Sequence, residues 1–148
     1  MRKAARAIVF NDDKLLVIDR DKFGKKYVTL PGGNIELGEE PEEAMRRELR
    51  EETSLEVGDC RLVFIEEAGD PYGTQYIYLC AYLGGEPELA QDSEEAAINR
   101  LGQNIHQPAW LLVDKLDDKP FVSEELKQRI IDGYRNQFPE EVEHFTTA

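Results

Sequence analysis

Residues 31–55 read PGGNIELGEEPEEAMRRELREETSL, and this stretch decides the fold because a loop signal is followed by a strong helix signal. Pro31-Gly32-Gly33 ends the preceding apolar segment, since proline and glycine both weaken a strand. Pro41 suits the first turn of a helix, where its missing N–H needs no partner. Residues 42–53 lack glycine and proline and are rich in good helix formers. The sequence predicts a sharp loop and then a helix.

The predicted helix contains an acidic cluster. Glu48, Glu51 and Glu52 are spaced i, i+3, i+4, which places their carboxylates on one patch. At about 5–6 Å, each like-charge pair costs on the order of 3 kcal/mol at an effective dielectric near 20, and well under 1 in bulk water. If the patch is solvated, the repulsion is small and the cluster has no functional meaning. If the patch lies in a cleft, a cation is needed to offset the repulsion. Carboxylates suit Mg²⁺, but spacing alone leaves both interpretations open.

Outward from this stretch, short apolar segments bounded by turn residues predict β-strands. They are expected at residues 3–10, 14–18, 27–30, 61–65, 74–83 and 109–113. A closing helix is expected over residues 124–138 with Ser123 as its N-cap, and residues 86–107 are expected to form a loop with room for one short helix. This order predicts an α/β fold, a mixed β-sheet covered by helices.

Composition and charge limit the function. The 148 residues, 41% hydrophobic and 33% charged, fit a single globular domain over residues 1–148. The net charge of −13 disfavours duplex nucleic acid and anionic membrane surfaces as partners. A polyphosphate ligand would be repelled as well unless metal ions lie between it and the acids. No apolar run approaches the roughly 20 residues that cross a bilayer, and no signal peptide is recognisable, so we expect a cytoplasmic protein.

The spacing of the central stretch resembles a known motif. Gly33, five residues, Glu39 and seven residues precede Arg47-Glu48-Leu49-Arg50-Glu51-Glu52-Thr53-Ser54-Leu55. This resembles the Nudix box and matches eight of its nine specified positions; Ser54 stands where the family usually has glycine. If residue 54 caps the helix in a left-handed conformation, serine is strained there. The flanking segments also resemble a Nudix domain, so the resemblance covers nearly the whole chain.

The resemblance implies a Nudix-type α/β/α sandwich and a hydrolase of a nucleoside diphosphate linked to another moiety, working with Mg²⁺ or Mn²⁺. By position in the motif, Glu48, Glu51 and Glu52 are the expected metal ligands, and the carbonyl of Gly32 is one more. Divalent ions suit a diphosphate because they neutralise its charge and lower the pKa of the attacking water.

Other motif positions are expected to be structural. The resemblance implies that Arg47 pairs with Glu39 and, with Gly33, holds the loop and helix in register. An exposed ion pair that contributes little is the alternative.

The resemblance leaves the general base open. Some relatives use a glutamate just before the tryptophan of the last strand, where this chain has Ala109. The remaining candidates are Glu94 and Glu95, or a box glutamate, Glu51 or Glu52, of which Glu52 is preferred. Glu94 and Glu95 are equally compatible with solvated loop charges.

Substrate contacts are predicted at cations and aromatic residues. Arg6 and Arg20, near the ends of the first two predicted strands, are the preferred phosphate ligands, although strand edges also use cations to block pairing. Pro71 and Tyr72 lie 16 and 17 residues beyond Leu55, offsets that resemble ADP-ribose hydrolases and dinucleoside polyphosphate hydrolases respectively. Both residues also fit a turn, so the substrate stays open among nucleotides, nucleotide-sugars and dinucleoside polyphosphates.

Two further points stay open. The rival to an enzyme is a catalytically weak Nudix-like module that senses a nucleotide without cleaving it, since a fold does not guarantee activity. Homodimers are common among relatives, and the sequence neither requires nor excludes one.

Overall fold

The structure is a computed structural model that describes residues 2–88, 102 and 104–147. Its strands are β1 (Lys3–Asn11), β2 (Lys14–Lys22), β3 (Lys25–Thr29), β4 (Gly32–Asn34), β5 (Val57–Glu67), β6 (Thr74–Tyr82), β7 (Asn104–Leu112) and β8 (Glu143–Thr146). Its helices are α1 (Pro41–Thr53), the 3-10 helix η1 (Val113–Asp118) and α3 (Glu124–Arg135).

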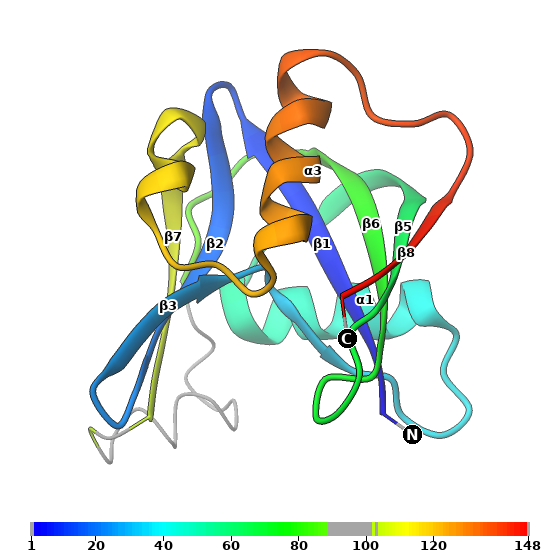
Figure 1. The fold of residues 1–148 in the computed structure, drawn as a ribbon, viewed down its shortest axis with the longest axis horizontal. Coiled ribbons are helices and arrows are strands. Elements are labelled where there is room, and N and C mark those ends of the chain that lie inside the picture. The colour runs from blue at the N-terminus through cyan, green and yellow to red at the C-terminus, as the bar shows by residue number, and fades with distance from the viewer. Residues whose placement is uncertain (1, 89–101, 103, 148) are drawn as a thin grey trace.

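The strands form a mixed sheet in the order β3-β2-β1-β6-β5-β8, with β4 also paired to β1 and β7 to β2. The pairs β1·β6 and β5·β8 are parallel, and the other pairs are antiparallel. Helix α1 lies behind the sheet and α3 in front of it (Figure 1). The predicted α/β fold, a mixed sheet flanked by helices, is confirmed.

Each face of the sheet has its own apolar core. Met45 and Leu49 of α1 belong to one cluster with Ala5 and Ala7 of β1. Ile8 belongs to the other cluster, which includes apolar residues of α3. Because side chains alternate along a strand, Arg6 lies on the same face as Ile8, opposite to α1.

The hairpin, the central helix and the closing helix are where the sequence predicts them, with β1 and β2 paired around residues 12 and 13. Ser123 caps α3 as predicted, because its side chain accepts a hydrogen bond from the Leu126 amide at 3.2 Å. The segment predicted as a sharp loop at Pro31-Gly32-Gly33 instead leads directly into β4, which pairs with β1 over Ala4, Ala5 and Arg6.

The C-terminal half shows where the predicted elements are wrong. Residues 104–107 belong to β7 rather than to a loop, because β7 pairs with β2 along its whole length; residues 89–101 and 103 of that stretch lie outside the described part. Helix α3 ends at Arg135 rather than at residue 138. A Cβ at Gly133 would lie 2.5 Å from the Phe138 ring, so the missing side chain lets Phe138 fold back onto the helix.

Besides β4, two further elements are absent from the sequence prediction, η1 and β8. Strand β8 has only four residues and pairs in parallel with the edge of β5. A segment this short gives no alternating pattern to detect. Among the described residues, no helix combines the length and the apolar character that crossing a membrane requires.

Candidate active site

Helix α1 is fixed at both ends. At its start, the Glu43 side chain accepts a hydrogen bond from the Glu40 amide at 3.0 Å, which completes a capping box. At its end, Ser54 has φ 62° and ψ 8°, the left-handed conformation in which a serine is strained. The Ser54 hydroxyl donates to the Glu88 carbonyl at 2.5 Å, a bond that the usual glycine could not make.

Arg47 joins α1 to the loop before it. Its guanidinium donates to both carboxylate oxygens of Glu39, at 2.8 and 3.0 Å, and to the Asn34 carbonyl at 3.0 Å. Hydrogen bonding to Arg47 holds the pKa of Glu39 below its usual value, and in return Glu39 raises the pKa of Arg47. The pairing that the motif implies is therefore present.

Gly33 makes room for Glu48. A Cβ on Gly33 would lie 2.5 Å from the Glu48 carboxyl carbon and 2.7–2.8 Å from its oxygens. The Glu48 carboxylate therefore lies directly over the backbone of β4, where Arg47 Nη1 also contacts its Oε1 at 2.9 Å. Only glycine at position 33 permits this close approach.

Glu52 and Glu51 have different environments. The Glu52 side chain is 4% exposed, and its Oε1 accepts a hydrogen bond from the Gly32 amide at 2.8 Å. Glu51 is 43% exposed, and its Oε2 lies 3.5 Å from Arg47 Nη1. Gly32 has φ 149°, and a Cβ there would lie 2.1 Å from the Ala5 carbonyl oxygen, so this position also requires glycine.

The three helix glutamates do not form a ready-made cluster. In the described ranges, no group of three acidic, histidine or cysteine side chains is arranged to hold a metal ion. Arg47 forms ion pairs with Glu48 and Glu51, and its positive charge offsets the repulsion between these carboxylates. The donor set nevertheless fits Mg²⁺ or Mn²⁺, because all three candidate ligands are carboxylates on neighbouring turns of one helix, and because Gly33 leaves a side-chain-free backbone beside Glu48.

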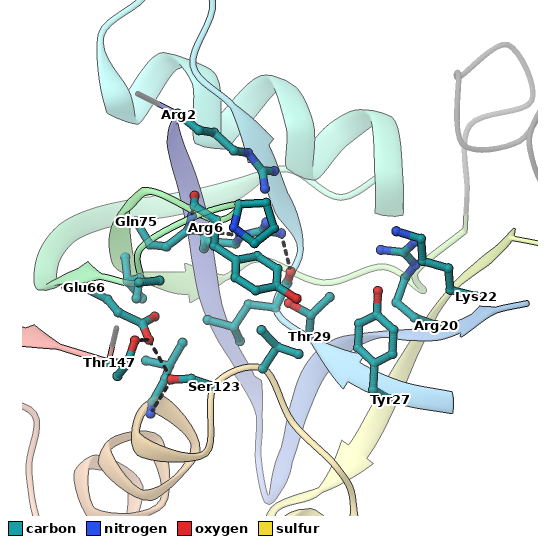
Figure 2. Close-up of a pocket in the computed structure, with 17 residues that line it drawn as sticks. Arg2, Arg6, Arg20, Lys22, Tyr27, Thr29, Glu66, Gln75, Ser123 and Thr147 are labelled. Carbon is teal, nitrogen blue, oxygen red and sulfur yellow. Dashed lines mark hydrogen bonds between the residues drawn. The ribbon is translucent and has the colours of Figure 1, made fainter. Parts of the chain in front are cut away.

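A cavity of about 440 Å³ opens on the face of the sheet opposite α1. Figure 2 shows Arg2 and Arg6 along one wall, and Arg20, Lys22 and Tyr27 at one end. Tyr72 also lines the cavity. The structure thus brings together Arg6, Arg20 and Tyr72, which the sequence offered separately. Sequence reasoning missed Arg2 and Lys22, because nothing in the local pattern separates them from ordinary surface charges.

Arg6 connects this cavity to the helix glutamates. Its Nε donates to Gln75 Oε1 and its Nη1 to the Leu30 carbonyl, both at 3.1 Å. Burial lowers the pKa of Arg6, and the charges of Glu52 and Glu48 oppose that shift. A guanidinium has five N–H donors and stays charged, so these two bonds leave Arg6 able to bind an anion.

Arg20 is held at the far end of the cavity. Its Nη2 donates to Asn104 Oδ1 at 2.6 Å, and its guanidinium carbon lies 5.4 Å from the centre of the Tyr27 ring. Its buried Nε has no hydrogen-bond partner among the residues described. Burial, together with the Arg20 charge, lowers the pKa of His106 to about 4, so this histidine is neutral at pH 7.

The structure describes two of the four candidates for the general base. Glu52 is buried and accepts a hydrogen bond from the Gly32 amide, while Glu51 is half exposed. Glu94 and Glu95 lie outside the described residues.

Comparison with known proteins gives a consistent picture. A model of the NUDIX domain matches residues 1–131. The ADP-ribose pyrophosphatase of Methanocaldococcus jannaschii is 36% identical over 98 residues, which cover 63% of this chain and 58% of that protein, less than two thirds of its length.

Solved structures share the fold. An ADP-ribose pyrophosphatase from Streptococcus suis has a TM-score of 0.69 at 20% identity, covering 97% of this chain and 98% of the other. A NUDIX hydrolase from Nitrosomonas europaea has a TM-score of 0.71 at 16% identity, covering 98% and 78%. With the family model matched over most of its length, this chain belongs to the NUDIX domain family.

Proposed function

We propose that this protein is a divalent-metal-dependent pyrophosphohydrolase that cleaves the diphosphate of a nucleoside diphosphate linked to another moiety. The observation that carries the proposal is the cavity lined by Arg2, Arg6, Arg20 and Lys22 in a chain with a net charge of −13. Cations gathered against the overall charge, with Arg6 electrostatically coupled to Glu48 and Glu52, suit an anionic ligand bound in this cavity.

Each group has a proposed role. Glu48, Glu51 and Glu52, with the Gly32 carbonyl, hold Mg²⁺ or Mn²⁺, which when bound neutralises phosphate charge and lowers the pKa of water. Arg6 and Arg20 bind and orient the diphosphate. Glu52 is the preferred general base, with Glu51, Glu94 and Glu95 as alternatives.

The structural part of the motif orients these groups. Arg47 and Glu39 hold the loop and α1 in register through their paired hydrogen bonds. Gly33 admits the Glu48 carboxylate to the backbone of β4. Neither Arg47 nor Glu39 needs to contact the substrate for this role.

The substrate we propose is a nucleotide-sugar of the ADP-ribose type. The support is that the Methanocaldococcus jannaschii relative is an ADP-ribose pyrophosphatase, and that Pro71 and Tyr72 both line the cavity. Tyr72 offers an aromatic ring to the ligand. A cytoplasmic location remains a prediction from the sequence, and the family leaves a homodimer open.

The test is product analysis on a substrate panel with Mg²⁺, containing ADP-ribose, NAD and a dinucleoside polyphosphate. We expect AMP and ribose 5-phosphate from ADP-ribose. Glu52→Gln should lower kcat by at least about 10²-fold, within the range for a lost base or metal ligand. Glu56→Gln, an exposed carboxylate just beyond α1, is the matched control. Tight binding without turnover on any substrate would contradict an enzyme and favour a nucleotide sensor.

A further inference from the structure

Glu66 is a buried carboxylate in the cavity to which the proposed function gives no role. It lies near the end of β5, is 3% exposed, and lines the cavity. Its neighbour two positions back, Phe64, is in the apolar core on the same face. The strand pattern therefore favours an apolar residue at position 66, and a buried carboxylate there is costly unless it is compensated.

The compensation comes from hydroxyl groups rather than from a cation. Glu66 Oε2 accepts hydrogen bonds from Ser123 Oγ at 2.6 Å and from Thr147 Oγ1 at 2.7 Å. Among described residues, no lysine or arginine forms an ion pair with it. A carboxylate has about four acceptor sites. Both bonds are to Oε2, and no described side chain is hydrogen-bonded to Oε1, which is therefore available to a ligand in the cavity.

The cavity is therefore electrically polarised. Figure 2 shows Glu66 with Ser123 and Thr147 on one side, and Arg20 with Lys22 on the other. A phosphate is attracted to the arginines and repelled by Glu66. The group that suits the Glu66 side is an uncharged hydrogen-bond donor, such as an N–H of a base or an O–H of a sugar.

Gln75 lies between the acidic and the basic side of the cavity. Glu66 pairs in register with Gln75 on β6, and Gln75 Oε1 accepts a hydrogen bond from Arg6. The Glu66 carboxylate on β5 is thus separated by a single strand, β6, from the strand β1 that carries the Arg6 guanidinium. The volume, about 440 Å³, is within the usual range for small-molecule sites, roughly 300–1,000 Å³.

We propose that Glu66 determines substrate selectivity, by accepting a hydrogen bond from a donor group on the nucleoside part of the substrate while the arginines hold its phosphates. This inference rests on the proposed function, because it assigns the nucleoside end of the same ligand. Two groups have the required chemistry, the exocyclic amine of the base and the hydroxyls of the ribose.

The experiment is calorimetric binding to the full chain with Mg²⁺ and α,β-methylene nucleotides, in which the bridging oxygen is replaced by carbon to block hydrolysis. The probes are α,β-methylene-ADP, its analogue without the 6-amino group, and its 2′,3′-dideoxy analogue. The variants are Glu66→Gln and the control Glu67→Gln. Glu67 is the next residue, is exposed, and undergoes the same change in charge.

We expect Glu66→Gln to bind α,β-methylene-ADP about tenfold more weakly or worse, because a charge-assisted hydrogen bond becomes a neutral one. We expect wild type to lose a similar factor with one of the two altered probes, and Glu66→Gln to lose less with that same probe. The amine probe identifies the base as the donor, and the dideoxy probe identifies the ribose. Glu67→Gln should match wild type.

Several outcomes overturn the inference. Tighter binding by Glu66→Gln would show that the carboxylate only repels phosphate. Unchanged binding, or no loss with either altered probe, would show that it contacts no donor. In each case hydrolysis of ADP-ribose by wild type would leave the proposed function standing. If wild type neither binds the probes nor hydrolyses the panel, the proposed function fails and the inference fails with it.

A second variant guards against misfolding. Thr147→Val removes one of the hydroxyls that orient Glu66 but keeps the side-chain shape. It should weaken binding of α,β-methylene-ADP by about two- to fivefold, a smaller factor than Glu66→Gln. The altered probe that lacks the donor group should bind Thr147→Val as well as it binds wild type. If Glu66→Gln does not fold, equal binding of α,β-methylene-ADP by Thr147→Val and wild type would overturn the proposal.

Discussion

The two sides of the sheet use charge in opposite ways. Beside α1, Arg47 donates hydrogen bonds to both carboxylate oxygens of Glu39, at 2.8 and 3.0 Å. In the cavity, the hydrogen bonds that Arg6 makes to described residues go to neutral oxygens, and Glu66 accepts hydrogen bonds from two hydroxyls. An ion pair that is already complete stabilises structure, whereas charges held by neutral partners remain available to a ligand. The difference separates the scaffold of the Nudix box from the surface that we propose binds substrate.

The largest expected effect comes from Gly33→Ala. The new Cβ would overlap the Glu48 carboxylate, which must then leave the backbone of β4. We expect kcat on ADP-ribose to fall by about 10²-fold, as for a displaced metal ligand, and unfolding to be easier by about 1–3 kcal/mol from overpacking. Gly58→Ala is the control, because its Cβ meets only the flexible Leu83 side chain closely, at 3.1 Å. Steady-state kinetics and thermal unfolding measure the two effects, and a fully active Gly33→Ala enzyme would contradict the account.

Arg6→Gln tests the cavity side of the comparison. The change removes the charge but keeps a donor for the neighbouring oxygens, so we expect KM for ADP-ribose to rise about tenfold or more. The fold should be little affected, because the bonds of Arg6 in the described chain go to neutral groups. An unchanged KM would remove Arg6 from the substrate site. Lys3→Gln, an exposed cation on the same strand, is the matched control.

His106 makes the stability of the folded protein depend on pH. Its folded pKa is about 4, lowered by burial and by Arg20, against an ordinary value of 6.5. The unfolded chain therefore binds more protons, and stability falls as pH drops from about 6.5 to 4. Allowing for partial exposure, we expect about 1 kcal/mol from this histidine. His106→Gln should flatten that part of the stability profile in denaturant titrations; an unaltered slope would show that His106 is not held neutral.

The smallest effect concerns the scaffold pair. Arg47 lowers the pKa of Glu39, so the stabilisation is present above the unfolded pKa and disappears as pH falls through the lower folded pKa. Glu39→Gln should cost less than about 1 kcal/mol near pH 7, since the pair is only partly shielded from solvent. The difference from wild type should vanish at strongly acidic pH. A difference that persists there would assign the effect to packing rather than charge.

The contrast also explains what sequence can predict. Gly33, Glu39 and Arg47 lie within one contiguous stretch, so spacing places them together and the structure shows them in contact. The cavity combines side chains from segments far apart in the sequence, such as Arg6, Arg20 and Glu66. No local sequence pattern indicates that these side chains come together. Glu66 in particular looks like any charge near a strand end, until the strand register places it beside Gln75.

The most direct test of the central claim is anomalous diffraction from crystals soaked with Mn²⁺ and α,β-methylene-ADP. The account predicts manganese beside Glu48, Glu51 and Glu52, with the nucleotide phosphates between that ion and Arg6. Manganese bound elsewhere, or a nucleotide whose phosphates lie away from Arg6, would contradict it.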